Sequence, residues 1–356
     1  MGTPCMSCGN IAGEISRFLS DNGIEHEVTI IDGMPLLRTS HGADILPLTI
    51  DATDPAAATE CRKAAERLIG HMEKRPLVIA QDRWIKDGEI FRKRLLAHLG
   101  RFRHIYARNC EVRRIRKDVA EKFMDACHSY GSAVSRYRYG LFLKKAQGGA
   151  DAGTMVAAAT FSNGRLMPRN GKVYRSFQWI RYASVPDIRA VGGMGKIIRH
   201  FISEDAMQAN ADDRLRPDFG GWDIMTYADL EWSDGRAYRE TGFRAEGMKS
   251  PVMYAVSTED WHRRPLSRIH EKRHMTGPDV PADMQADVQA DMQADIQADM
   301  QADIQADMQA DIQADMQADI QADMQEGAPQ WDTLFIENFG SIRYRLLIPY
   351  DKKADI

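Results

Sequence analysis

The residues "RAVGGMGK", 189–196, join a strand-like segment to a helix-like one. The segment before them, "SFQWIRYASVPD" (176–187), is rich in the aromatic and β-branched residues of strands. The segment after them, "KIIRHFISEDA" (196–206), repeats apolar residues at helical spacing. Glycines at such a junction let backbone N–H groups approach an anion, and the helix start adds partial positive charge. An ordinary tight turn also needs glycine, and the spacing matches neither common nucleotide-binding loop.

A second short motif, "YRETGF" (238–243), ends the next predicted helix. A strand is expected at "WDIMTYAD" (222–229), and the helix is expected at "SDGRAYRETG" (233–242). Gly242 is a typical helix stop, and Phe243 is a typical first residue of the following strand. Taken alone, the motif therefore predicts only an ordinary helix end.

The patterns around both motifs predict one α+β domain over residues 104–261, with a mixed and mostly antiparallel sheet flanked by helices. A smaller α/β domain is expected over residues 1–103, with helices at 12–24, 54–74 and 87–100 and strands at 25–31 and 76–82. Within the larger domain, strands are expected at 105–115, 138–146, 154–164, 176–187, 222–229, 243–247 and 251–256, and helices at 117–131, 196–206 and 233–242.

The two motifs together resemble the core of the GNAT acyltransferase superfamily, over residues 105–257. In that family a Q/R-x-x-G-x-G/A loop holds the coenzyme A pyrophosphate, and a later tyrosine lies near the thioester sulfur before a Gly-Phe pair. Gly193 and Gly195 fit the two glycines, but the leading position falls on Ala190, with Arg189 one residue early. The resemblance implies that acetyl-CoA or another acyl-CoA is the cofactor, held by Arg189, Val191, Gly192, Gly193, Gly195 and Lys196.

The activity that the resemblance implies is N-acyl transfer to an amine. Backbone N–H groups around Ala183 and Val185 would stabilise the oxyanion, and Tyr238 would protonate the leaving thiolate. His128 or Asp229 would deprotonate the amine. His128 is also a candidate helix C-cap, and Ser233 is a natural N-cap as well as a candidate site residue.

A narrower resemblance links the chain to phage and mobile-element proteins that include the Mom-type DNA-modifying enzymes. Its basis is "YARNCE" (106–111), His128 to Gly131, "VGGMGK" (191–196) and 227–243. This resemblance implies a nucleobase or another DNA-linked acceptor. It also implies that residues 1–103 are a degenerate very-short-patch-repair-like endonuclease.

The nuclease chemistry itself is not expected to survive in residues 1–103. Glu14, Asp44 and Asp51 are its candidate metal-binding carboxylates, but no Glu-x-Lys follows them on a strand. The rival hypotheses are a non-catalytic DNA-binding accessory protein of a mobile element and a residual nuclease.

Charge is distributed unevenly along the chain. The formal net charge is −4, but residues 282–325 are eleven ADMQ, ADVQ or ADIQ tetrapeptides with 11 Asp and no base. Residues 1–281 hold 35 acidic and 43 basic residues, a net charge of +8, and the basic ones concentrate between 83 and 145. That stretch is either a DNA-binding face or a solvated surface.

Targeting signals are absent from the sequence patterns. There is no apolar run of about 18 residues and no basic-then-apolar leader, so neither a membrane span nor secretion is expected. Five cysteines without a signal indicate the cytoplasm. Cys5 and Cys8 are either free thiols or, with His26 or Cys61, part of a metal site, and free thiols are preferred.

The remaining segments are a proline-containing linker (262–281), the repeat (282–325) and a strand-forming C-terminal segment (326–356) expected to dock onto the body. A four-residue period drifts around a helix, so the repeat has no fixed apolar stripe to bury. It is either a lone helix or disordered. Trp179, Trp222 and Trp232 are expected in the core rather than stacked on a base. Oligomeric state is left open.

Overall fold

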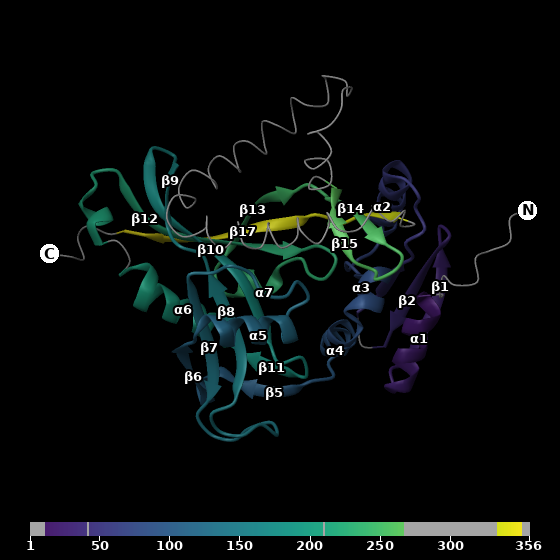
Figure 1. Cartoon of the computed structure of the whole chain (residues 1–356), viewed down its shortest axis with the longest axis horizontal. Coiled ribbons are helices and arrows are strands. Elements are labelled where there is room, and N and C mark those ends of the chain that lie inside the picture. Colours follow the sequence, from purple (N-terminus) through teal and green to yellow (C-terminus); the bar gives the residue numbers. More distant parts are fainter. Residues whose placement is uncertain (1–10, 41–42, 209–210, 267–332, 351–356) are drawn as a thin grey trace, which may run out of the picture.

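The structure is a computed structural model, and it describes residues 11–40, 43–208, 211–266 and 333–350. The fold is α+β, as predicted, with mixed sheets flanked by helices (Figure 1). The repeat and the Cys5–Cys8 pair lie outside the described residues. Among the described helices, none is both long enough and apolar enough to cross a membrane.

The N-terminal unit is a four-stranded sheet with helices around it. Its strand order is β1-β2-β3-β4, with only the β3–β4 pair parallel. The bounds are α1 Ile11–Asp21, β1 His26–Ile31, β2 Met34–Thr39, β3 Ile45–Leu48, α2 Pro55–Gly70, β4 Leu77–Ala80, α3 Gln81–Lys86 and α4 Gly88–His98. The predicted helices and strands of this region are confirmed. β2, β3 and α3 were not predicted, because the two strands are short and each contains a proline.

The main sheet has the order β13-β17-β12-β10-β8-β7-β6, with β9 paired to β10. Every pair in it is antiparallel except β10 with β12, which confirms the predicted mostly antiparallel sheet. The bounds are β6 Cys110–Arg114, β7 Tyr137–Leu143, β8 Met155–Phe161, β9 Arg165–Arg169, β10 Lys172–Ser184, β12 Phe219–Asp229, β13 Arg244–Lys249 and β17 Ser341–Pro349.

Two predicted strands differ from the structure. Residues 105–115 were expected as one strand, but a 3₁₀ turn at Ala107–Asn109 divides them into β5 (Arg103–Tyr106) and β6. β5 leaves the main sheet and pairs with β11 (Ile188–Val191), the strand that leads into the glycine-rich turn. Of the strand expected at 251–256, only residues 253–256 are in a strand, β14 (Met253–Ser257), which lies outside the main sheet.

The C-terminal segment supplies strands to two sheets. β14 (Met253–Ser257) forms a three-stranded sheet with β15 (Arg263–Pro265) and β16 (Thr333–Glu337). β17 lies between β12 and β13, so the last strand of the chain completes the main sheet (Figure 1). Residues 263–265 are thus a strand where a linker was expected.

Helices cover both faces of the main sheet. α5 (Lys117–Cys127) packs on one face, where Met124 meets Ala158 and Ala183. α6 (Gly193–Phe201) covers the other face, and Phe201 stacks on Phe161 at 4.0 Å between ring centroids. The short α7 is Arg236–Glu240, and single turns follow α6 at Ile202–Ala206 (π) and Ala211–Leu215 (3₁₀).

The segment after β12 contacts the N-terminal unit and so connects it to the main sheet. Trp232 is 3% exposed and packs into the core of the N-terminal unit against Phe91. The backbone N–H of Val78 donates to the Glu231 carbonyl at 2.8 Å, and Arg263 forms a buried ion pair with Asp82. These contacts bring α4 close to the C-terminal end of β10. All three tryptophans predicted as core are buried, which confirms that prediction.

Candidate functional site

The site begins where the parallel strands β10 and β12 separate. Their paired register ends at Gln178 opposite Met225, although both strands continue beyond that point. From Trp179 onward β10 pairs only with β8, and β12 pairs only with β17. Backbone groups of both strands therefore face a gap in the sheet that none of the described strands fills.

Tyr238 lies at the start of this gap. The hydroxyl of Thr226 donates to the Trp179 carbonyl at 3.1 Å. This bond joins the first residue of β12 and the first residue of β10 that are no longer paired with each other. Tyr238 forms a side-chain hydrogen bond with Thr226, and burial raises the pKa of the Tyr238 phenol. Its ring is also held by Trp179 and Tyr344. A tyrosine in this position stays protonated at neutral pH and can act as an acid.

The first turn of α6 lies next to the helix that carries Tyr238. A Cβ placed on Gly195 would lie 3.8 Å from the Thr241 methyl group, just after α7, and 3.3 Å from the Arg199 guanidinium. The N-cap is Gly192 at φ 75°, and among the described residues no side chain caps the helix. The first hydrogen bond of the helix joins the Lys196 N–H to the Gly192 carbonyl. The three amides before it, at positions 193–195, therefore have no acceptor within the helix. Such a turn is suited to binding an oxyanion.

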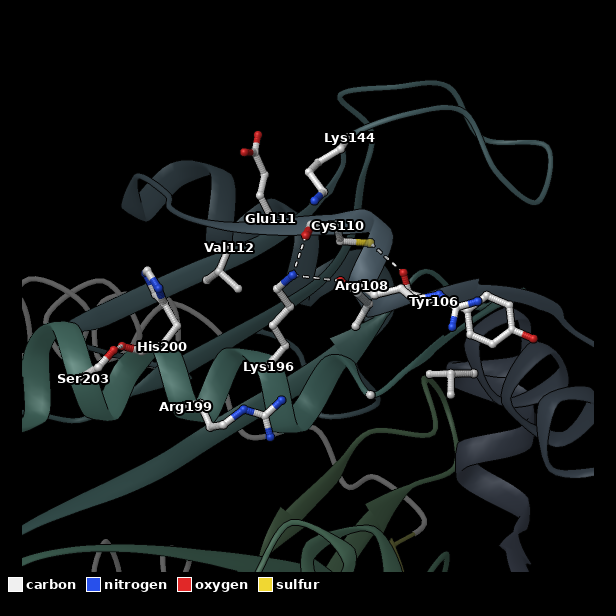
Figure 2. Close-up of a pocket in the computed structure, with 13 residues that line it drawn as sticks. Tyr106, Arg108, Cys110, Glu111, Val112, Lys144, Lys196, Arg199, His200 and Ser203 are labelled. Atoms are coloured by element: carbon white, nitrogen blue, oxygen red, sulfur yellow. Dashed lines mark hydrogen bonds between the residues drawn. The ribbon is translucent and has the colours of Figure 1, made fainter.

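A basic groove of about 870 Å³ runs between α6 and the β5–β6 segment (Figure 2). Arg108, Lys144, Arg199 and His200 line it, together with a single carboxylate, Glu111. We call it the α6–β6 groove. It shares Val191 and Gly192 with the glycine-rich turn. A ligand with several phosphates can therefore contact the turn and the groove together.

Lys196, predicted to bind the cofactor, has two backbone partners. Its ammonium donates to the carbonyls of Ala107 at 3.0 Å and Cys110 at 2.6 Å (Figure 2). This side chain holds the 3₁₀ turn against α6. Arg189 lies on β11, with its guanidinium 5.3 Å from the Phe102 ring centroid, and it lines a different cavity from the groove.

The amides predicted to stabilise an oxyanion, those of Ala183 and Val185, both face β8 rather than the gap, so that prediction is wrong for these two residues. The N–H of Val185 donates to Val156 on β8 at 3.0 Å. Since bonding positions recur at every second residue of an antiparallel ladder, the Ala183 amide also faces β8. The amides of Tyr182 and Ser184 therefore face the edge from which β12 has separated.

His128, Tyr130 and Asp229 come together at the end of α5 and β12. Tyr130 donates its hydroxyl proton to Asp229 at 2.7 Å, and its backbone N–H donates to His128 Nδ1 at 3.1 Å. The neutral His128 ring thus carries its proton on Nε2. Burial, with Arg181 and Arg94 nearby, lowers the pKa of His128 to about 3. His128 is therefore neutral near pH 7 and presents a donor rather than a base.

Ser233 follows this cluster, in the turn that precedes α7, and its backbone N–H donates to the Asp229 carbonyl at 2.9 Å. Its hydroxyl accepts a hydrogen bond from the Gly235 N–H at 3.0 Å. The N-cap of α7 is Gly235, so the expectation that Ser233 caps this helix is wrong. The helix begins later than predicted because two side-chain-to-backbone turns, at Ser233 and Asp234, come first.

Sequence reasoning missed several residues of the site. Thr226 and Tyr130 carry no local signal beyond an ordinary strand and loop. Glu231 is a buried carboxyl whose pKa is raised to about 7, chiefly by burial. Arg94 comes from α4 of the N-terminal unit and donates to the Ser129 hydroxyl at 2.9 Å. Arg94 reaches the site only because the two units pack together, so no local sequence pattern could have revealed it.

The residues considered for nuclease or metal chemistry show no such arrangement. Within the described part of the chain, no group of three or more His, Cys, Asp or Glu side chains could hold a metal ion. His26 is hydrogen-bonded to the Ser16 hydroxyl at 2.7 Å and to the Ile24 carbonyl at 3.0 Å. Cys61 is half-buried and free.

Comparisons with known proteins are sparse. No protein-family model and no curated protein matches the chain. Among solved structures, a chain in "Crystal structure of the NatC complex bound to Gag peptide and CoA" matches with 13% identity and a TM-score of 0.25. The match covers 39% of this chain and 87% of that one. A likeness this low carries no weight for the family or the activity of this chain.

Proposed function

We propose that the chain is an acyl-CoA-dependent N-acyltransferase. The observation that carries the proposal is the position of Tyr238. Its phenol is hydrogen-bonded to Thr226, where β10 and β12 separate. The helix that carries Tyr238 lies next to the first turn of α6, which no described side chain caps. One site thus combines an anion-binding turn, a gap lined by unpaired backbone edges and a half-buried acid.

The cofactor is proposed to lie in one orientation, from the α6–β6 groove across the first turn of α6 to the gap. Its pyrophosphate binds the first-turn amides of α6, and its nucleotide end lies over the α6–β6 groove, where basic side chains outnumber the one carboxylate. The pantetheine arm enters the gap, where unpaired strand edges offer hydrogen bonds to its amides. The thioester then reaches Tyr238.

The reaction is a single acyl transfer. The amine nitrogen attacks the thioester carbonyl carbon, and the amides of Tyr182 and Ser184 stabilise the oxyanion. The C–S bond then breaks as Tyr238 gives its proton to the thiolate. Asp229 takes the proton that the amine loses, because His128 in its neutral form presents a donor.

Replacing Tyr238 with Phe tests this assignment. We expect release of coenzyme A thiol from acetyl-CoA, measured with a panel of primary amines, to fall by about 100-fold, the lower range for a lost general acid. The affinity for acetyl-CoA should stay unchanged, because the ring and its aromatic contacts remain. Tyr227→Phe is the matched control, since this neighbour of Thr226 points to the opposite face of β12. Equal rates in both variants would remove Tyr238 from the chemistry.

The finer proposal is a nucleobase or DNA-linked acceptor, supported by the net positive charge of residues 1–281. Several basic side chains between residues 83 and 145 already have a carboxylate partner. Carboxylates lie within 3.2 Å of Arg83, Lys93, Arg103, Arg113 and Arg116. We therefore expect few phosphate contacts and weak, non-specific binding.

Binding to a labelled duplex, measured by fluorescence anisotropy, tests the acceptor class. With about three phosphate contacts, affinity should fall roughly 40-fold between about 50 and about 200 mM salt. Deleting the acidic residues 282–325 should tighten binding. No binding at low salt would refute a DNA acceptor and leave the acyltransferase proposal intact. DNA binding without acetyl-CoA binding would favour the non-catalytic accessory protein.

A further inference from the structure

A second cavity, of about 400 Å³, lies between α4 and the C-terminal end of β10. We call it the α4–β10 cavity. Ile90, Arg94 and His98 line it from the N-terminal unit, and the Cys127–Ser129 and Tyr182–Ser184 segments line it from the main sheet. In the part of the chain that the structure describes, its lining contains two arginines, Arg94 and Arg189, and no carboxylate. It reaches the same edge of β10 that faces the gap.

Among the described residues, Arg94 in this cavity has no carboxylate partner, in contrast to three other arginines with little exposure. Arg175, Arg263 and Arg345 each lie within 2.7 Å of a carboxylate oxygen. The Arg94 guanidinium donates to the neutral Ser129 hydroxyl and lies 4.3 Å from the Trp232 ring centroid. Within the described residues, no carboxylate comes within 4.0 Å of it. A largely buried cation without an anion is costly unless a ligand supplies one.

The surroundings of Arg94 favour an anion over a second cation. Burial lowers the pKa of His128, and the nearby Arg181 and Arg94 lower it further. The His128 ring is therefore neutral near pH 7, and its Nε2–H can act as a hydrogen-bond donor. Ser129 and Ser184 add hydroxyl groups. Arginine suits a carboxylate or a phosphate because its planar fork binds two oxygens at once.

We propose that the α4–β10 cavity holds the acceptor, and that this acceptor is a small amine with an oxyanion group that binds Arg94. The identification as the acceptor site rests on the proposed acyl transfer, because the cavity includes the β10 edge assigned to the oxyanion. The N-terminal unit then has a role in substrate selection. A cavity of this volume takes a small molecule rather than a polymer, so this acceptor is the rival of the DNA-linked one, and the DNA-binding measurement helps to distinguish them.

Thermal unfolding of the full chain tests the oxyanion site with two probes, inorganic phosphate and acetate, at constant ionic strength. We expect at least one probe to raise the Tm of the wild-type chain by roughly 5 °C near saturation. The probe that acts distinguishes a phosphate-bearing acceptor from a carboxylate-bearing one. Arg94→Met should show a smaller rise, with any remainder coming from the anion-binding turn of α6. Its own Tm without anion should equal or exceed that of the wild type, since an unpaired charge is gone and the contact with Trp232 is kept.

Two further variants complete the experiment. Lys93→Met removes one positive charge from the exposed side of the same helix and should keep the full rise. Arg94→Lys keeps the charge without the planar fork and should show a smaller rise, which covers the case in which Arg94→Met does not fold. No rise with either probe, or an equal rise in Arg94→Met or Arg94→Lys, would overturn the proposal. Acetyl-CoA titration of the wild type in parallel tests the acyltransferase proposal separately.

Discussion

Ending the chain at residue 332 is expected to abolish folding. The truncation removes β16 and β17, and β17 is an interior strand of the main sheet. It removes the buried Tyr344, which is 1% exposed, and leaves Asp223, which is 0% exposed, without its Arg345 partner at 2.5 Å. Breaking a buried pair costs about 3–5 kcal/mol and deleting a buried aromatic about 3–5 kcal/mol. Together these losses match the total stability of an ordinary domain, about 5–15 kcal/mol.

Deleting residues 282–325 is the matched control for that truncation. β15 and β16 flank the same strand, β14, so their separation is roughly 10 Å across the sheet. The connection shortens from residues 267–332 to the 22 that remain, which still span this distance easily. Loop closure changes by only about 1 kcal/mol. Far-ultraviolet circular dichroism and thermal unfolding should show a folded deletion variant and an unfolded truncation. A cooperative transition in the truncated chain would contradict the role given to β17.

Gly195→Glu is expected to remove acetyl-CoA binding while keeping the fold. Position 195 is the third residue of α6, where glutamate is favoured and reaches back to the N-cap amide. The new carboxylate occupies and repels the oxyanion site. Losing two charge-assisted hydrogen bonds of about 1.5–3 kcal/mol each weakens binding by at least about 100-fold. Stability should rise by about 1 kcal/mol, because a glycine leaves a helix.

Gly195→Gln separates charge from bulk in the same experiment. It has the size of glutamate without the charge, so it should weaken binding less than Gly195→Glu does. Gly193 is unsuitable for this test, because a Cβ there would lie 2.8 Å from the Tyr182 hydroxyl and disturb the core. Wild-type affinity in the folded Gly195→Glu variant would exclude the first turn of α6 from the cofactor site.

Local patterns in the sequence were sufficient for much of the fold. Apolar spacing predicted α1, α2, α4 and α5, and alternation predicted β7, β8, β10 and β12. The glycine-rich turn was correctly placed between a strand and a helix. Gly192 adopts a left-handed φ that glycine accepts readily, so the local residue choice and the fold agree there.

Long-range pairing could not be predicted in the same way. β17 inserts between β12 and β13 after a connection of more than sixty residues, and no short-range pattern specifies that partner. For the site, Tyr238 was found from its motif. Thr226, which places the phenol at the gap, and Arg94, which comes from helix α4 of the N-terminal unit, depend on tertiary packing alone.

Calorimetric titration of the full chain with acetyl-CoA tests the central claim most directly. The account predicts one molecule bound per chain, with a dissociation constant in the range of about 1 μM to about 1 mM that is usual for enzyme substrates. Free coenzyme A should compete for the same site. Absence of binding heat and of competition up to millimolar concentration, with the chain folded, would contradict the assignment of this gap and helix turn to an acyl-CoA.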